Sequence, residues 1–219
     1  MRSRSPESRR GGFTLIELLV VLALILLFTV VGFPALSRIL DQRRLTSFVQ
    51  EASVVLARAR AEAIQRGVPV VAEPDFEDRE IRVWADVDDD GAYEPDPDVT
   101  PRTVDYFVTR VRLPTESEVH FWGPDDSDPY GSDAIRDLTE IDDGENSYVF
   151  EPDGSIRDVG ALRIGDERGN YFELSAQPKS TGRVQVLKYN ADPAWTGGTE
   201  GFYPAGNHAS SGDPLWVWY

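Results

Sequence analysis

The chain has 219 residues, of which 41% are hydrophobic and 27% are charged, and it contains no cysteine. These values predict a folded protein over most of the length, and they exclude disulfides, cysteine nucleophiles and thiolate metal sites. The formal net charge is −16, but four arginines and one glutamate give the first twelve residues a local charge of +3. The acidic remainder disfavours nucleic acid as a partner and favours calcium ions or basic protein surfaces.

Residues 13–33 form an apolar run in which Glu17 is the only charged residue. At ~1.5 Å per residue, a helix of this length spans about 30 Å, the thickness of a bilayer core. The preceding arginines predict a cytoplasmic N-terminus, with the rest of the chain outside. A signal peptide fits less well, because its apolar core is usually only ~7–15 residues long and ends at a small-residue cleavage site. A plain anchor leaves a carboxylate in lipid unexplained.

The stretch Gly12-Phe13-Thr14-Leu15-Ile16-Glu17 resembles the cleavage and methylation motif of type IV pilins and type II secretion pseudopilins. A short basic leader ends in glycine, phenylalanine follows, and glutamate is the fifth residue after the break. The resemblance implies that prepilin peptidase cuts between Gly12 and Phe13 and N-methylates the new Phe13 amine. It also implies that Glu17 pairs with the N-terminal amine of a neighbouring subunit, because a buried charge is tolerated when it is paired.

Pro34 lacks a backbone donor, so it predicts a kink in the helix. Apolar residues then recur at spacings of three and four from Leu45 to Ile64, and Gly67 is suited to a C-cap. We therefore expect one bent helix over residues 13–66. Its first part would cross the membrane or line a fibre, and its amphipathic continuation, residues 34–66, would pack against a domain.

Short β-rich runs bounded by glycine, proline, aspartate or asparagine fill residues 67–189 and predict antiparallel strands. The expected strands are Val68–Ala72, Ile81–Ala85, Tyr106–Leu113, Val119–Trp122, Tyr148–Phe150, Ala161–Ile164, Tyr171–Ser175 and Arg183–Tyr189. The stretches VLARARAEAIQRGVPVVAE and FEPDGSIRDVGALRIGDERGNYFELSAQPKSTGRVQV resemble the GspH/FimT group of minor pseudopilins and minor pilins. The expected fold is α+β, with the long helix packed on one or two antiparallel sheets.

Two segments interrupt this scheme. Residues 123–146 carry nine acidic side chains and one arginine, and a loop of this length without an apolar pattern is either functional or mobile. Residues 190–219 contain no lysine or arginine but are rich in aromatic side chains. The aromatic residues are Trp195, Phe202, Tyr203, Trp216, Trp218 and Tyr219. They either cover a sheet edge of the same domain or contact a partner.

The stretch Asp86-Val87-Asp88-Asp89-Asp90-Gly91 matches the first half of a calcium loop, with acidic oxygens at Asp86, Asp88 and Asp90 and a glycine for the turn. The twelfth position is Pro97, which has no side-chain ligand. Other acids would have to replace it: Glu94, Asp96 and Asp98. Two interpretations stay open, a calcium site and a solvated acidic hairpin turn.

Only two histidines occur, His120 and His208, and no nucleophile elbow or glycine-rich phosphate loop accompanies them. We expect no enzymatic activity, and no cofactor other than the candidate calcium ion. The expected function is that of a minor pseudopilin, a structural subunit of a type II secretion pseudopilus. It would be a single-pass protein of the bacterial inner membrane with a periplasmic C-terminal domain. Prepilin peptidase, other pseudopilins or pilins, and secreted protein cargo are the expected partners.

Two alternatives accompany this interpretation. The chain could be a minor type IV pilin of the FimT kind, acting in pilus assembly or DNA uptake, although no basic residue follows Lys188. From another class, it could be a membrane-anchored calcium-binding adhesin or an exported enzyme.

Overall fold

The computed structural model describes residues 14–95, 104–114, 119–125, 134–141, 146–190 and 201–204. The chain divides into two compact units, residues 1–42 and residues 43–219. Both units share one long helix, and each unit is described below by itself.

The helix α1 extends over Leu15–Arg66 and is continuous through Pro34. Thr14 caps its start, because the Thr14 Oγ1 accepts the backbone N–H of Glu17 at 3.3 Å. It ends at Gly67, which has φ +74° and donates its N–H to the carbonyl of Ala63 at 2.9 Å. The extent predicted from the sequence is therefore confirmed to within two residues at the N-terminus, and the kink expected at Pro34 stays a prediction.

The first unit consists, among its described residues, of the helix alone. Its apolar side chains face outward, and Leu15 and Phe28 are 81% and 75% exposed. An apolar surface of this kind marks a contact with another molecule or with lipid. Within the described part of the chain, no helix combines the length and apolarity needed to span a membrane. The span expected over residues 13–33 begins at Phe13, outside the described residues, and stays a prediction.

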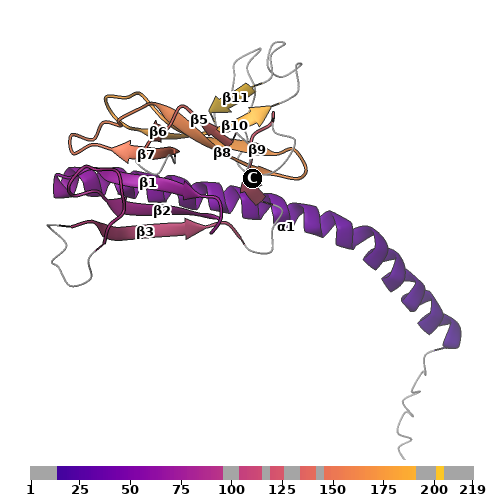
Figure 1. Cartoon of the computed structure of the whole chain (residues 1–219). Coiled ribbons are helices and arrows are strands. Elements are labelled where there is room, and N and C mark those ends of the chain that lie inside the picture. Colours follow the sequence, from indigo (N-terminus) through magenta and orange to yellow (C-terminus); the bar gives the residue numbers. More distant parts are fainter. Residues whose placement is uncertain are drawn as a thin grey trace, which may run out of the picture. The chain divides into compact units, whose positions relative to one another are not determined.

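The second unit contains two antiparallel sheets in its described part (Figure 1). The first sheet has the order β3-β2-β1-β7-β6, and the second has the order β11-β10-β9-β8-β4, with β5 paired to β8. The strands of the first sheet are β1 (Val70–Asp75), β2 (Glu80–Ala85), β3 (Tyr106–Arg112), β6 (Thr139–Glu140) and β7 (Asn146–Phe150). Those of the second are β4 (Val119–Phe121), β5 (Ile135–Arg136), β8 (Gly160–Asp166), β9 (Tyr171–Ala176), β10 (Val184–Asn190) and β11 (Gly201–Pro204).

The main core joins the second half of α1 to both sheets. Leu45, Phe48 and Leu56 of the helix are buried together with side chains of both sheets, among them Ile81 and Phe121. Figure 1 shows this half of the helix running alongside the strands. The apolar spacing read from the sequence therefore marks the face that packs, and the expected α+β fold is confirmed.

A second, smaller apolar cluster lies apart from the main core. Val71, Trp84 and Val149 come from β1, β2 and β7 and are fully buried, and Ile141, which is 9% exposed, packs with them. Tyr93 closes this cluster, with its ring centroid 5.4 Å from that of Trp84. The first sheet is therefore buried at this point on the side away from the main core as well.

Three short strands were not predicted. β5 and β6 lie within the acidic insertion, and β11 lies within the aromatic C-terminal segment. β5 and β6 have two residues each and are too short to show an alternating pattern. They are strands because β5 pairs with β8 and β6 pairs with β7. β11 pairs Phe202 with Tyr189 at the edge of the second sheet, where neighbouring glycines and a proline hide the strand signal.

Candidate functional site

The first candidate site is the start of the helix. Gly12 and Phe13 lie outside the described residues, so the predicted cleavage point is not described. Glu17 is exposed in the first turn of α1, three residues after Thr14, which caps the helix. A threonine followed three residues later by glutamate is the capping-box pattern, and an acid in the first turn also interacts favourably with the helix dipole.

This cap was missed from the sequence. The Thr14–Glu17 spacing was the available signal, but the leader motif drew attention to the charge of Glu17 alone. Glu17 can therefore stabilise the start of its own helix as well as meet a neighbouring amine, and an experiment on Glu17 must separate the two effects.

The second candidate site is the loop after β2. Asp86, Asp88, Asp90 and Asp105 each offer one carboxylate oxygen, and these four oxygens all lie within 4.8 Å of one another. Asp86 and Asp105 are buried, whereas Asp88 and Asp90 are exposed. The structure therefore brings the three predicted ligands together and adds a fourth.

Asp105 was missed because it is distant along the chain from the first three acids. The hairpin pairing of β2 with β3 places Ala85 opposite Tyr106, so the residue after β2 and the residue before β3 meet at the strand ends. An aspartate on each side of a predicted hairpin was the signal that could have found it. Of the substitutes expected for Pro97, Asp96 and Asp98 lie outside the described residues, as does Pro97.

The loop folds around the two buried carboxylates. Asp86 accepts the N–H groups of Asp90 at 3.2 Å and Gly91 at 3.1 Å. Asp105 accepts those of Val87 at 2.8 Å and Glu94 at 3.2 Å. Burial, with a contribution from the negative charge of Asp105, raises the pKa of Asp86 to about 6, although the N–H donors oppose this shift.

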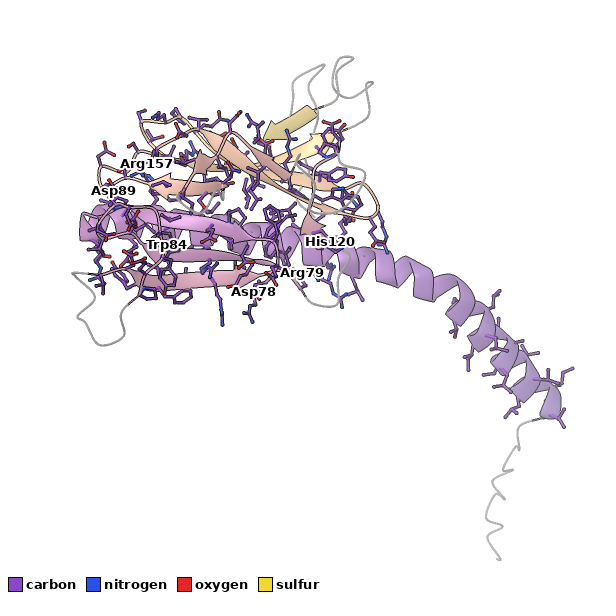
Figure 2. The ribbon with its side chains drawn as sticks, viewed as in Figure 1. Asp78, Arg79, Trp84, Asp89, His120 and Arg157 are labelled. Carbon is purple, nitrogen blue, oxygen red and sulfur yellow. The ribbon has the colours of Figure 1, made fainter. Side chains whose placement is uncertain are left out.

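Asp89 faces away from the cluster. Its carboxylate accepts a hydrogen bond from the Arg157 guanidinium at 2.6 Å, and the same guanidinium contacts Glu151 at 2.8 Å. Figure 2 shows Asp89 and Arg157 beside one another. Asp89 has φ +59°, a conformation that aspartate tolerates better than most residues. This ion pair ties the acidic loop to the segment between β7 and β8.

The donor set of the cluster suits a hard cation. Carboxylate oxygens are the ligands that Ca²⁺ prefers, and four converge here. Asp86 and Asp105 also accept backbone N–H groups of the loop, so these two carboxylates can serve simply to stabilise a hairpin turn. The calcium interpretation and the turn interpretation both fit this geometry.

His120 is half-buried on β4, opposite Gly165, with its ring centroid 6.4 Å from that of Trp122. Burial and the nearby Arg79 lower the pKa of His120, which favours the neutral ring. Figure 2 shows the side chains of His120 and Arg79 in the same part of the unit. His208 lies outside the described residues. These observations give His120 a place in an aromatic cluster on the second sheet.

Residues 8–33 match the family model described as the prokaryotic N-terminal methylation motif. No curated protein and no solved structure matches the chain. The motif indicates a membrane-anchored protein of the type IV pilin or pseudopilin kind, and it implies processing by prepilin peptidase and assembly with pilin-type subunits. The match covers the end of the leader and the apolar segment, so the resemblance of the later stretches to the GspH/FimT group stays a prediction.

Proposed function

We propose that the chain is a minor pseudopilin, a non-enzymatic structural subunit of a type II secretion pseudopilus. The observation that carries the proposal is the methylation motif at residues 8–33, placed at the start of a single helix that continues into the core of a β-rich unit. That arrangement suits a subunit that joins a fibre by its apolar N-terminal helix and presents its β domain outward.

In this role, prepilin peptidase cuts after Gly12 on the cytoplasmic side of the inner membrane and methylates the amine of Phe13. Glu17 then pairs with the same amine of an adjoining subunit as the helix enters the fibre. Removing one partner of a buried ion pair typically costs about 3–5 kcal/mol, because the other charge is left uncompensated. The β domain lies in the periplasm and contacts other subunits or secreted cargo. The role needs no cofactor and no catalytic residue.

The test compares three substitutions in the full chain, expressed in a host that carries the secretion machine. Glu17→Ala removes the carboxylate. Glu17→Gln keeps a side chain that suits the capping box but carries no charge. Thr14→Ala is the matched control, because it removes the cap seen in the structure and leaves Glu17 in place. The measurements are the mature N-terminal mass, the membrane level of the subunit and the fraction recovered in sheared fibres.

All three variants should carry N-methylated Phe13 at normal membrane levels. Glu17→Ala and Glu17→Gln should each reduce incorporation into fibres by about tenfold or more, given that ~1.4 kcal/mol is a factor of ten. Thr14→Ala should retain incorporation, because a lost cap costs only about 1 kcal/mol. If the Glu17→Gln variant kept full incorporation and Thr14→Ala abolished it, Glu17 would be a helix cap and the ion-pair proposal would be wrong.

A minor type IV pilin is the second candidate, since the same motif serves both machines. Deleting the gene distinguishes them. Loss of protein secretion with normal pili supports the pseudopilin, whereas loss of pili or of DNA uptake with normal secretion supports the pilin. An unprocessed N-terminus that retains Met1 would contradict both and would support an anchored adhesin or enzyme.

A further inference from the structure

The first sheet has a long edge strand, β3. This strand has seven residues, and among the residues that the structure describes it pairs with β2 alone. Figure 1 shows β3 at the border of the sheet, next to β2. At the opposite described edge of the sheet, β6 has only two residues. A long edge strand presents a row of N–H and C=O groups to which another strand can bind.

The hydrogen bonds beside β3 indicate which of its backbone groups face outward. Leu113, the residue after β3, donates its N–H to the carbonyl of Arg79 at 2.8 Å. In an antiparallel pair, every second residue bonds the partner strand, and the residues between them point away from it. Val111 therefore faces β2, whereas the N–H and C=O groups of Arg110 and Arg112 point away from the sheet.

The side chains of the same two residues carry exposed positive charge. The side chains of Arg110 and Arg112 are 51% and 53% exposed, and their guanidiniums lie 3.7 Å and 2.6 Å from the carboxylate of Glu80. The Glu80 side chain is only 3% exposed, so the carboxylate lies beneath and the guanidiniums reach into solvent. The whole chain has a net charge of −16. The edge of β3 therefore presents positive groups on a strongly acidic protein.

An exposed aromatic ring lies on the same face of β3. Arg110 is the cross-strand partner of Arg82, and Phe107 is the partner of Trp84. Directly opposite positions share a face, so Arg110 and Phe107 both lie on the side of the smaller apolar cluster, to which Trp84 belongs. The register skips Val108 between them, and Phe107 is 47% exposed. The outer face of this edge thus combines two guanidiniums with one apolar ring.

A second copy of β3 is a poor occupant of this edge. Only outward-facing residues can exchange hydrogen bonds with an added strand. Two antiparallel copies would then place Arg110 opposite either Arg110 or Arg112 of the other copy. Like charges directly opposite each other destabilise a strand pair, whereas opposite charges stabilise it. The charge of the edge therefore favours a strand that carries acidic side chains.

We propose that the edge of β3 binds an extended, antiparallel segment of another protein, with acidic side chains at two alternate positions and an apolar side chain after them on the same face. The acids lie opposite Arg112 and Arg110, and the apolar side chain lies opposite Phe107. Backbone hydrogen bonds to the two arginine residues supply affinity, and the side chains supply specificity. This binding surface goes beyond the fibre role proposed above and does not depend on Glu17.

The test measures the binding of synthetic peptides to the full chain in detergent. The first peptide alternates glutamate with valine and ends in phenylalanine. One control peptide has glutamine in place of each glutamate, and the other is N-methylated at each glutamate, which keeps the charge and removes the backbone donor. Arg110→Glu reverses one charge of the edge, and Arg58→Glu is the matched control, because Arg58 is exposed on α1. Hydrogen exchange at single amides reports the backbone bonds.

The glutamate peptide should bind the parent chain. Glutamine should weaken binding by about threefold or more, and N-methylation by about fivefold or more. Arg110→Glu should weaken binding of the glutamate peptide by about fivefold or more, and Arg58→Glu by less than about twofold. At a peptide concentration about ten times Kd, exchange at the amides of Arg110 and Arg112 should slow by about tenfold, and exchange at Val111 should not change.

Equal binding of the three peptides would overturn the proposal, and so would bound peptide without slower exchange at Arg110. Absence of binding at about 1 mM peptide would overturn it as well. A single-stranded oligonucleotide that binds more tightly than the glutamate peptide, and that Arg110→Glu releases, would assign the edge to nucleic acid instead. If a higher concentration of the chain alone slowed exchange at Arg110, a second copy would occupy the edge. Each of these two results would also overturn the proposal.

Discussion

Replacing Asp86 by asparagine tests the energetic cost of its buried charge. Asp86 is fully buried and its pKa is about 6, above the ordinary value of 3.8. Between these two pH values the folded state holds a proton that the unfolded state has released. The contribution of Asp86 to the free energy of unfolding therefore falls as pH rises from about 4 to about 6, and it stays low above that range. A shift of this size corresponds to about 2–3 kcal/mol at neutral pH.

Asparagine removes this charge but replaces one of two acceptor oxygens with a donor. The bond to Gly91 or to Asp90 is then lost, which costs about 1 kcal/mol. At pH 7.5 the Asp86→Asn chain should therefore be more stable by about 1–2 kcal/mol, or about 3–6 °C in Tm. At pH 4.5 the advantage should vanish or reverse, because Asp86 is then protonated in the folded protein.

The assay is thermal unfolding of the full chain in detergent with EDTA, followed by circular dichroism between pH 4 and pH 8. The control is Asp88→Asn in the same loop; the Asp88 side chain is exposed, so this substitution should change Tm little. The decisive quantity is the difference in Tm between Asp86→Asn and the parent. If that difference is the same at pH 4.5 and pH 7.5, the argument from burial is wrong.

Three further outcomes are expected. Gly154→Ala should destabilise the chain by about 2–3 kcal/mol in urea unfolding, because φ is +83° and the new Cβ would lie 2.9 Å from Cδ1 of Ile64. Gly169→Ala has open space around it and should cost only about 1 kcal/mol. Equal costs for the two substitutions would contradict the packing argument. Leu56→Ala should cost about 2–5 kcal/mol, because its side chain is fully buried between the helix and the sheets; a cost below about 1 kcal/mol would place it outside the core. Calcium chloride should raise Tm more at pH 8 than at pH 5, where Asp86 is protonated, and Asp88→Asn should reduce this rise in Tm. If Tm does not rise at either pH, the loop is a turn without an ion.

The long helix and the main strands could be predicted because their signals are local. The spacing of apolar residues from Leu45 onward identifies the buried helix face, and Gly67 ends the helix in the expected left-handed conformation. The positions of the eight expected strands also follow from β-rich runs between turn residues. These features depend on neighbours within one turn of helix or one strand, and the sequence displays such neighbours directly.

The missed features depend on contacts between distant segments. Asp105 joins the acidic cluster only because β2 and β3 form a hairpin, and β11 exists only through its pairing with β10. The Tyr171 ring likewise meets the rings of Trp122 and Tyr189, which come from two other segments. No single stretch of sequence contains any of these arrangements. The cap at Thr14 is different, since its signal was local and was masked by a stronger motif at the same residues.

The contact between Tyr93 and Trp84 gives the acidic loop a built-in optical reporter. The Trp84 indole is fully buried, donates a hydrogen bond from Nε1 to Glu73 at 3.3 Å, and is covered by a ring that the loop itself carries. Whatever frees the loop, whether a proton, a cation or a bound protein, would admit water to that indole and shift its emission to longer wavelength. In a variant of the purified chain whose other four tryptophans are replaced by phenylalanine, the state of the acidic loop could thus be followed without attaching a dye.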